Sequence, residues 1–300
     1  MACPLAQVRQ FAIGDHVVAT LIRSCGHCTP CRTARPFQCQ NPDETLRSPG
    51  ARPRLQHRSA PITSVFGTAA FAEYSLVHQN QLVKVPNDLP FPQAAVLGCS
   101  ALTGAGAAIN SARVRPGNSV VVIGLGGVGL NVISGAKLAG AGQIVAVDAN
   151  PQKEALARSF GATHFVNALA GDPVSLIMEL TSGGADHVFE AVGLDETISL
   201  SLKSASVGGA VYLMGVREPG NLMGIDVFTD LIRKQVSIEG VYMGASDPAH
   251  DIPMYASLYL QGRFNLDDLI SKTGHISEIN EMYSELNSGN IARAVITSFT

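Results

Sequence analysis

The glycine-rich stretch at residues 124–129 constrains the fold of this chain more than any other feature. Four β-branched apolar residues, 120–123, precede it, and such a run is typical of a strand that is buried on both faces. Glycines at 124, 126, 127 and 129 follow where that strand would turn sharply into a helix. The pattern alone is weak, because glycine-rich turns also occur where the backbone only has to bend.

The segments after the turn strengthen its interpretation as a nucleotide site. A helix is predicted over 128–138, and a predicted strand over 143–147 ends at Asp148. This acid lies close to the spacing expected for one that binds the adenosine ribose. Its carboxylate would accept hydrogen bonds from the 2′- and 3′-hydroxyls and repel a 2′-phosphate, so the sequence predicts NAD rather than NADP. The alternative is a solvated acid at a strand end.

Each glycine of the turn has a predicted role. Gly124 would make the tight turn, Gly126 would let the pyrophosphate approach the backbone, and Gly129 would let the helix pack on the strand. The free N–H groups at the start of the helix would face the phosphate charge. The predicted cofactor-binding residues of the turn are Gly124, Leu125, Gly126, Gly127, Val128 and Gly129.

Helices and strands alternate after the turn, which is the order that a doubly wound parallel sheet requires. The predicted helices are 151–160, 173–180 and 196–206, and the predicted strands are 164–166, 187–190, 210–214 and 236–241. The tail departs from this alternation, with helices over 252–261 and 277–287 and a last strand over 292–298. The fold class is therefore α/β, and residues 243–300 are expected to pack on the first domain.

Length and charge limit the possible functions. A chain of 300 residues is long enough for about two domains. A net charge of −3 with only 15% charged residues favours neither nucleic acid nor an anionic membrane as a partner. The first ten residues do not resemble a secretory signal, and no apolar run approaches the length needed to span a bilayer. We therefore expect a soluble, cytoplasmic protein.

Four cysteines before the turn predict a metal site. Cys25, Cys28 and Cys31 are separated by two residues each, and Cys39 follows. Four thiolates can enclose one tetrahedral zinc ion completely, so the site would be structural rather than catalytic. The alternative is four unliganded cysteines that pack as small apolar side chains. Cys3 is expected to be a free thiol.

The rest of the N-terminal region has a weaker pattern. Strands are predicted over 16–22, 71–77 and 81–85, and a helix of small residues over 94–110. Residues 41–64 contain few apolar side chains and are expected to form a solvated loop.

Four motifs in one order resemble the zinc-dependent medium-chain alcohol dehydrogenases. They are the four-cysteine lobe, an isolated Gly-Cys at 98–99, the turn at 124–129 and Ala-Arg-Ala-Val-Ile at 292–296. The resemblance runs from about Phe11 to the end. It implies a groES-like catalytic domain at 1–99, a Rossmann domain at 100–242 and a C-terminal return at 243–300. It also implies NAD, zinc, a small-molecule alcohol or aldehyde substrate, and a homodimer or homotetramer.

The resemblance also assigns roles to single residues. Cys99 is similar to a ligand of a catalytic zinc, and Arg293 to an arginine that contacts the pyrophosphate. Thr103 and Val128 are implied to line the nicotinamide, and Met214 to Val216 to supply the backbone that meets its carboxamide. Val192 is also predicted to bind the cofactor.

One departure from the family pattern concerns the catalytic zinc. Family members carry a cysteine ligand, a proton-relaying Ser or Thr, and a Gly-His-Glu segment before the turn at 13–15, and this chain has none of them. We expect an N-terminally truncated member with an incomplete groES-like domain. The first hypothesis is an NAD-dependent alcohol dehydrogenase. The alternatives are a catalytically impaired protein that binds NAD and zinc, and a zinc-free reductase, which the four-cysteine lobe disfavours.

Overall fold

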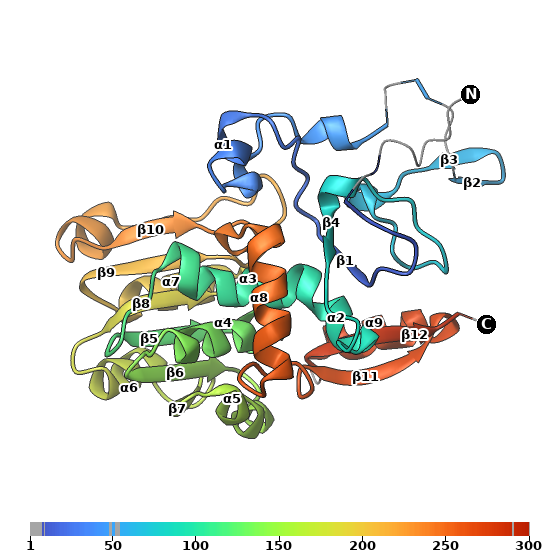
Figure 1. Cartoon of the computed structure of the whole chain (residues 1–300). Helices are drawn as coiled ribbons and strands as arrows, with labels where there is room; N and C mark the ends of the chain where they lie inside the picture. The colour runs from blue at the N-terminus through green and yellow to red at the C-terminus, as the bar shows by residue number, and fades with distance from the viewer. Residues whose placement is uncertain (1–7, 9, 48–49, 52–54, 290, 300) are drawn as a thin grey trace.

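The computed structural model describes residues 8, 10–47, 50–51, 55–289 and 291–299 and has two parts (Figure 1). One part is built on a parallel sheet with helices, and the other holds short strand pairs from both ends of the chain. A cysteine-rich lobe with the short helix α1 (Thr29–Arg32) projects above the sheet in this view. Cys3 lies outside the described residues.

Six parallel strands form the large sheet. They are β5 (Ser119–Ile123), β6 (Gln143–Asp148), β7 (His164–Asn167), β8 (Ala185–Glu190), β9 (Ala205–Leu213) and β10 (Ser237–Gly240). Their order is β10-β9-β8-β5-β6-β7, so the chain winds outward from β5 in one direction and then from β8 in the other. This is the doubly wound order, and the predicted fold class is confirmed.

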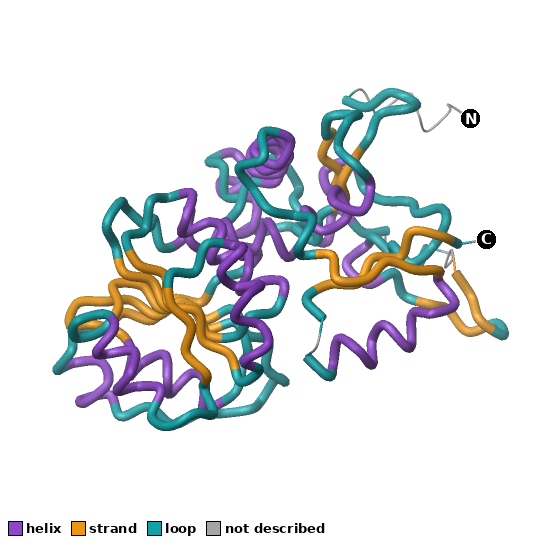
Figure 2. Tube along the Cα trace, turned by 90° about the horizontal axis from the view of Figure 1, so that it is seen from below, coloured by secondary structure: helices purple, strands orange, loops and turns teal. Residues whose placement is uncertain are grey.

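Helices cover both faces of this sheet (Figure 2). They are α4 (Gly127–Leu138), α5 (Glu154–Phe160), α6 (Pro173–Leu180) and α7 (Asp195–Ser204). Alternate residues of β5 serve two separate cores: Val120 and Val122 belong to the core that includes α4 and α5, and Val121 and Ile123 to the core that includes α6 and α7. The strand is therefore buried on both faces, as its unbroken apolar run predicts.

A continuous helical segment over 91–111 joins the two parts. It comprises α2 (Phe91–Val96), the π-helical turn η6 (Leu97–Ala101), α3 (Leu102–Gly106) and the π-helical turn η7 (Ala107–Ser111). By length and composition this segment is apolar enough to span a membrane, so the expectation that no run has that length was wrong. Its most apolar window is 67% buried inside the protein, which makes it a core helix. The segment also crosses the proposed domain boundary at 99.

The smaller part contains strands from distant regions of the chain. β1 (Val17–Ala19) pairs antiparallel with β4 (Leu82–Lys84), and β11 (Ile270–His275) pairs parallel with β12 (Arg293–Ser298). Helix α2 contacts both β11 and β12, so the C-terminal segment returns to the N-terminal region. The other elements with a bearing on the site are η8 (Pro151–Lys153), η9 (Val227–Ile232), η10 (Met243–Ala245), α8 (Pro248–Leu260) and α9 (Ile279–Asn287).

The structure contradicts three predictions in the smaller part. Residues 71–77, predicted as a strand, form no described strand, and Phe71, Tyr74 and Leu76 are exposed there. The predicted loop 41–64 contains an exposed hairpin of β2 (Leu55–His57) and β3 (Ala60–Ile62). The predicted strand 16–22 shortens to β1, since only three of its residues pair with β4. Strand β11 was not predicted.

Candidate functional site

The glycine-rich turn lies at the carboxyl end of β5, where the winding of the sheet reverses. Gly124 has a φ of +92° and donates a hydrogen bond of 2.9 Å to the carbonyl of Val147 in β6. A side chain at Gly124 would overlap Val192, and one at Gly129 would overlap the Gly124 carbonyl. These two glycines are therefore required by the turn itself and by the packing of α4 on β5.

The next two glycines face a different environment. A Cβ atom at Gly126 would meet nothing within 4 Å, so the space over the turn is open. A Cβ atom at Gly127 would overlap the guanidinium of Arg293, which reaches the turn from β12. The guanidinium is held by a 2.9 Å hydrogen bond from Nη1 to the carbonyl of Ala292. The first turn of α4 contains no acidic residue. Helix N–H groups and a fixed cation thus surround an open space, which suits an anion.

Asp148 connects the end of β6 to the turn. Its Oδ2 accepts a 2.8 Å hydrogen bond from the N–H of Leu125, and its Oδ1 accepts one of 2.9 Å from the N–H of Asn150. Lys153 places its Nζ 3.0 Å from Oδ2, and both side chains are largely buried. These contacts fix the orientation of the carboxylate at the edge of the turn.

Two loops follow β8 and β9 at the same edge of the sheet and carry the predicted residues Val192, Met214 and Val216. Val192 lies against Gly124, because a Cβ atom at Gly124 would overlap its side chain. The side chain of Val216 is exposed, and Met214 is half-buried and donates its N–H to the carbonyl of Glu190. Val192 therefore lies against the turn, and Met214 and Val216 lie in the neighbouring loop, whose backbone contacts Glu190 and Gly193.

Glu190, the last residue of β8, organises the first of these loops. It is completely buried. Its Oε1 accepts hydrogen bonds of 2.8 Å from the N–H of Val192, 2.7 Å from the N–H of Gly193 and 2.7 Å from the hydroxyl of Thr197. Its other oxygen is buried without a partner among the described residues. A buried carboxylate with three donors holds the loop backbone in one conformation.

The core helix brings two further predicted residues to the turn. Thr103 is buried and donates its hydroxyl to the sulfur of Met243, at 3.6 Å. Its neighbour Gly104 packs directly on the backbone of α4, where a side chain would overlap the carbonyl of Val128. Thr103 and Val128 thus lie on two helices that are in direct contact.

Cys99 lies near the turn but belongs to no described metal cluster. Its side chain is exposed, yet the protein atoms around it displace water and raise the pKa of the thiol, an effect that the charge of Arg293 opposes. Among the described residues, no set of three or more His, Cys, Asp or Glu side chains includes Cys99. The described residues therefore do not fit a catalytic zinc at Cys99, which would need three protein ligands.

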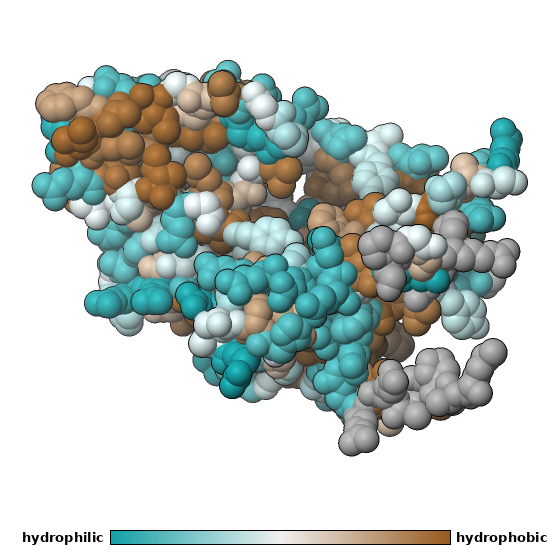
Figure 3. Space-filling model, turned by 90° about the horizontal axis from the view of Figure 1, so that it is seen from above, coloured by the Kyte–Doolittle hydropathy of each residue, from teal (hydrophilic) through white to brown (hydrophobic). Residues whose placement is uncertain are grey.

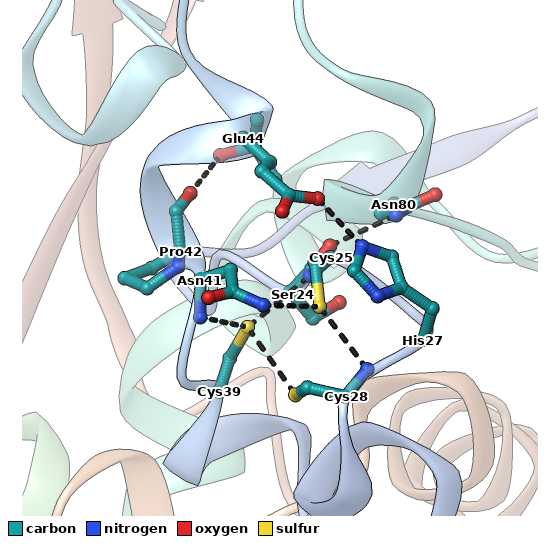
Figure 4. A network of polar contacts seen from close by, with 10 residues as sticks. Ser24, Cys25, His27, Cys28, Cys39, Asn41, Pro42, Glu44 and Asn80 are labelled. Atoms are coloured by element: carbon teal, nitrogen blue, oxygen red, sulfur yellow. Dashed lines mark hydrogen bonds and ion pairs between the residues drawn. The ribbon is translucent and has the colours of Figure 1, made fainter.

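The four cysteines of the lobe converge on one point, and Figure 4 shows three of them, Cys25, Cys28 and Cys39. The sulfurs of Cys25, Cys28, Cys31 and Cys39 all lie within 4.8 Å of one another. A zinc ion bound at about 2.3 Å from each sulfur needs sulfurs about 3.8 Å apart, so this cluster fits zinc. Backbone N–H groups point at the sulfurs: Cys25 donates to Cys39 at 3.2 Å, and Asn41 donates to Cys39 at 3.4 Å.

The surroundings of the four thiols shift their pKa values in opposite directions. Burial acts against ionisation, but N–H groups of His27 and Cys28 lower the pKa of Cys25 to about 6. Burial raises the pKa of Cys31 to about 12. A bound zinc ion would hold all four as thiolates. His27 is exposed and pairs with Glu44 at 2.7 Å, which raises the pKa of the imidazole.

Three residues of the site were not found from the sequence. Glu190 could have been recognised as an acid at the end of a predicted buried strand. Lys153 follows Asp148 by five residues, but nothing in the sequence indicates their ion pair. Arg217 follows the predicted residue Val216 and joins the two loops through Asp195. The ion pair of Arg217 with Asp195 forms because β8 and β9 are neighbours in the sheet, and the sequence around Arg217 does not reveal this.

The fold and the two sites define a class of protein. A glycine turn at the switch point of a doubly wound sheet, joined to a small β part with a closed four-cysteine lobe, is the arrangement of a zinc-binding dehydrogenase. The sequence profile of the family described as "Zinc-binding dehydrogenase" matches residues 127–260, and that of the "Alcohol dehydrogenase GroES-like domain" matches residues 4–87. The chain belongs to the zinc-dependent medium-chain alcohol dehydrogenase family and is an oxidoreductase.

Individual relatives agree with this assignment. "Alcohol dehydrogenase-like 6" of Arabidopsis thaliana is 34% identical over 295 residues, which cover 96% of this chain and 77% of the relative. An alcohol dehydrogenase zinc-binding domain protein from Burkholderia ambifaria has a TM-score of 0.90 at 33% identity, covering 98% of this chain and 80% of the other. Benzyl alcohol dehydrogenase from Acinetobacter calcoaceticus has a TM-score of 0.88 at 34% identity, covering 97% and 79%. Zinc and a nicotinamide cofactor are general to the family.

Proposed function

We propose that this chain is an NAD-dependent oxidoreductase that transfers hydride between a small-molecule alcohol or aldehyde and the cofactor. The observation that carries the proposal is the convergence of Asp148, the open space over Gly126 and the Arg293 guanidinium at one edge of the sheet. When bound, NAD would supply the hydride acceptor. The residues of the chain would bind the cofactor and orient its nicotinamide ring.

The adenosine half would be held by Asp148. Its carboxylate is already oriented by backbone N–H groups, and Oδ1, which accepts a single hydrogen bond, retains acceptor capacity for a ribose hydroxyl. Lys153 compensates the carboxylate charge through their ion pair, so this cation is already engaged and offers less to a 2′-phosphate. This arrangement favours NAD over NADP.

The pyrophosphate would lie over Gly126. The N–H groups at the start of α4 would donate to it, and the Arg293 guanidinium would supply the counter-charge. Because Arg293 belongs to β12, the binding of the phosphate would also connect the two parts of the protein.

The nicotinamide ring would lie beyond the turn. Val192 and Val216 would form an apolar wall, and the backbone at 214–216 would meet the carboxamide. Thr103 and Val128 would line the opposite side. Water would be excluded from the ring by these apolar side chains.

The four-cysteine lobe would hold one structural zinc ion through Cys25, Cys28, Cys31 and Cys39. The isolation of Cys99 among the described residues favours a second candidate function, a protein that binds NAD and one zinc ion without turnover. NADH formation on a panel of primary and aromatic alcohols, measured together with NADH binding, distinguishes the two: binding with turnover supports the oxidoreductase, and binding alone supports the second candidate.

Replacing Asp148 by asparagine (D148N) tests the proposed cofactor. The variant loses the charge that orients the ribose hydroxyls, so we expect NADH to bind about 10- to 100-fold more weakly, the loss typical of a charged hydrogen-bonding partner. The preference for NADH over NADPH should fall. Calorimetric titration with both cofactors measures the two quantities. Asp268→Asn, a surface acid beyond α8, is the matched control and should bind as the wild type does. Failure of the wild-type chain to bind NADH would contradict the proposed function.

We also propose that the chain is a homodimer or homotetramer. The segment between β9 and β10 exposes large apolar side chains, namely Val216, Leu222, Ile225, Val227, Phe228 and Ile232. An apolar area occupies the end of the molecule that carries η9 and β10 (Figure 3). Strand β10 is also an edge of the sheet, and no other described strand pairs with its outer side. Both features are typical of surfaces that a partner covers.

Sedimentation tests the proposed oligomer. The wild-type chain is expected at the mass of a dimer or tetramer. Phe228→Glu places a charge on the exposed apolar segment and should shift the protein toward monomer. Leu169→Glu makes the same kind of change at an exposed leucine beyond β7, at the other edge of the sheet, and should leave the mass unchanged. A wild-type monomer at all concentrations would overturn the proposal.

A further inference from the structure

The two loops beside the glycine turn are in direct backbone contact. They comprise residues 191–195, which follow β8, and residues 214–217, which follow β9; we call them the β8 loop and the β9 loop. A side chain at Gly193 would approach the carbonyl of Val216 to 2.8 Å, and one at Gly215 would overlap the N–H of Gly193. The two glycines allow this approach, so the position of one loop limits that of the other.

A buried side chain holds the β8 loop in place, and no described side chain does the same for the backbone of the β9 loop. Glu190 fixes the β8 loop through three hydrogen bonds to its Oε1. Among the described residues, the backbone of the β9 loop donates hydrogen bonds only at its start, from the N–H groups of Met214 and Gly215 to the carbonyl of Glu190. Beyond Gly215 the chain has no described helix or strand until η9 begins at Val227. The position of Val216 therefore depends on another contact.

Arg217 supplies that contact. Its Nη1 lies 2.5 Å from Oδ1 of Asp195 and donates a 3.3 Å hydrogen bond to the carbonyl of Gly193. Beyond Gly215, these are the only side-chain hydrogen bonds or ion pairs between the two loops among the described residues. Asp195 is the first residue of α7, so the partner of the guanidinium is attached to a helix. The Arg217 side chain is only 21% exposed, whereas that of Asp195 is 57% exposed.

An ion pair with one exposed partner contributes little to global stability, because water screens it. The pair can still affect the β9 loop itself. It restricts the conformations of this loop, which would otherwise have to become ordered when a ligand binds. Ordering such a loop in advance increases affinity for any ligand group that packs on it.

We propose that Arg217 is a positioning residue for the nicotinamide half of the cofactor. By joining the β9 loop to Asp195 and Gly193, it fixes the wall formed by Val192 and Val216. The inference rests on the proposed function, because it requires that NAD binds at this edge. The adenosine half lies at Asp148 and the glycine turn, and Arg217 contacts neither, so only the nicotinamide half should depend on it.

Two ligands separate these halves experimentally. ADP-ribose carries the adenosine, pyrophosphate and ribose groups but lacks the nicotinamide, and NADH carries all of them. In Arg217→Gln we expect the Kd of NADH to rise about tenfold and that of ADP-ribose to stay within about twofold. The blue shift of the fluorescence of bound NADH should also decrease, because the ring meets a less ordered wall.

Two further variants control the experiment. Asp195→Asn weakens the same pair and should change the binding of NADH in the same direction, and its effect should not add to that of Arg217→Gln. Arg158→Gln removes a comparable pair, between Arg158 and Glu154 on α5, at 2.7 Å and partly exposed. This variant should bind both ligands as the wild type does. Thermal unfolding of each variant measures any loss of fold.

The outcomes distinguish the inference from the function on which it rests. Unchanged binding of NADH to Arg217→Gln would overturn the role of Arg217 while leaving the NAD site intact. An equal loss for NADH and ADP-ribose would also overturn it, because the effect would then be general. A wild-type chain that binds neither ligand would overturn the proposed function and the inference together.

Discussion

The variant Gly126→Ala (G126A) is expected to fold normally and to bind NADH about 10- to 100-fold more weakly. The added methyl group meets no protein atom within 4 Å, so the folded chain can accept it. The backbone at Gly126 has a φ of −82°, which alanine also adopts, and loss of a glycine N-cap costs at most about 1 kcal/mol. The same methyl group would occupy the space proposed for the pyrophosphate, where overpacking costs about 1–3 kcal/mol.

Calorimetric titration with NADH and ADP-ribose measures this effect, and thermal unfolding measures stability. Gly224→Ala is the matched control, because a Cβ atom there also meets nothing within 4 Å and Gly224 lies in the exposed segment before η9. It should bind both ligands as the wild type does. If G126A retained wild-type affinity for ADP-ribose, the pyrophosphate would not lie over Gly126.

Replacing Cys39 by serine (C39S) is expected to remove the zinc ion and unfold the cysteine-rich lobe. Four sulfurs meet in a lobe of about twenty residues with little other core, so its folding should depend on the metal. Binding of a structural zinc ion contributes about 10–16 kcal/mol in isolated zinc-finger peptides, far more than one side chain contributes otherwise. Zinc content per chain should fall from about one to near zero, and limited proteolysis should cut within residues 25–45.

Cys99→Ser is the matched control for the loss of zinc. Cys99 is a free thiol that belongs to no described metal cluster, so its replacement should leave about one zinc ion per chain. Two zinc ions in the wild-type chain, with one lost in this variant, would contradict the isolation of Cys99. Retention of zinc by C39S would show instead that three thiolates suffice.

The sequence was informative where one local rule decides the structure. The run of β-branched residues at 120–123 predicted a strand buried on both faces, and it forms the centre of the sheet. The alternation of helices and strands predicted the doubly wound order, and the spacing of the four cysteines predicted a cluster. Each of these features depends on residues that lie close together in the chain, so their pattern is visible without coordinates.

The sequence was less informative where distant segments meet. The composition of residues 71–77 is typical of a strand, but strand formation also depends on where distant segments lie, and the structure has no strand there. The exposed hairpin of β2 and β3 has almost no apolar pattern to reveal it. The contact of Arg293 with Gly127 joins positions 166 residues apart, and only the resemblance to a family pointed to it. The partnership of Arg217 with Asp195 depends on the placement of two loops that the sequence does not fix.

The direct packing of Gly104 on the backbone of α4 has a mechanical consequence. Gly135, further along α4, makes a similar contact with α3, where a side chain would approach the Cα atom of Ala105 to 2.7 Å. With no side chains between them, the two helices cannot slide or rotate on each other without a clash. Thr103 on one helix and Val128 on the other therefore keep a constant separation. The contact therefore makes the two helices a single rigid unit, on which both residues proposed to line the nicotinamide are mounted.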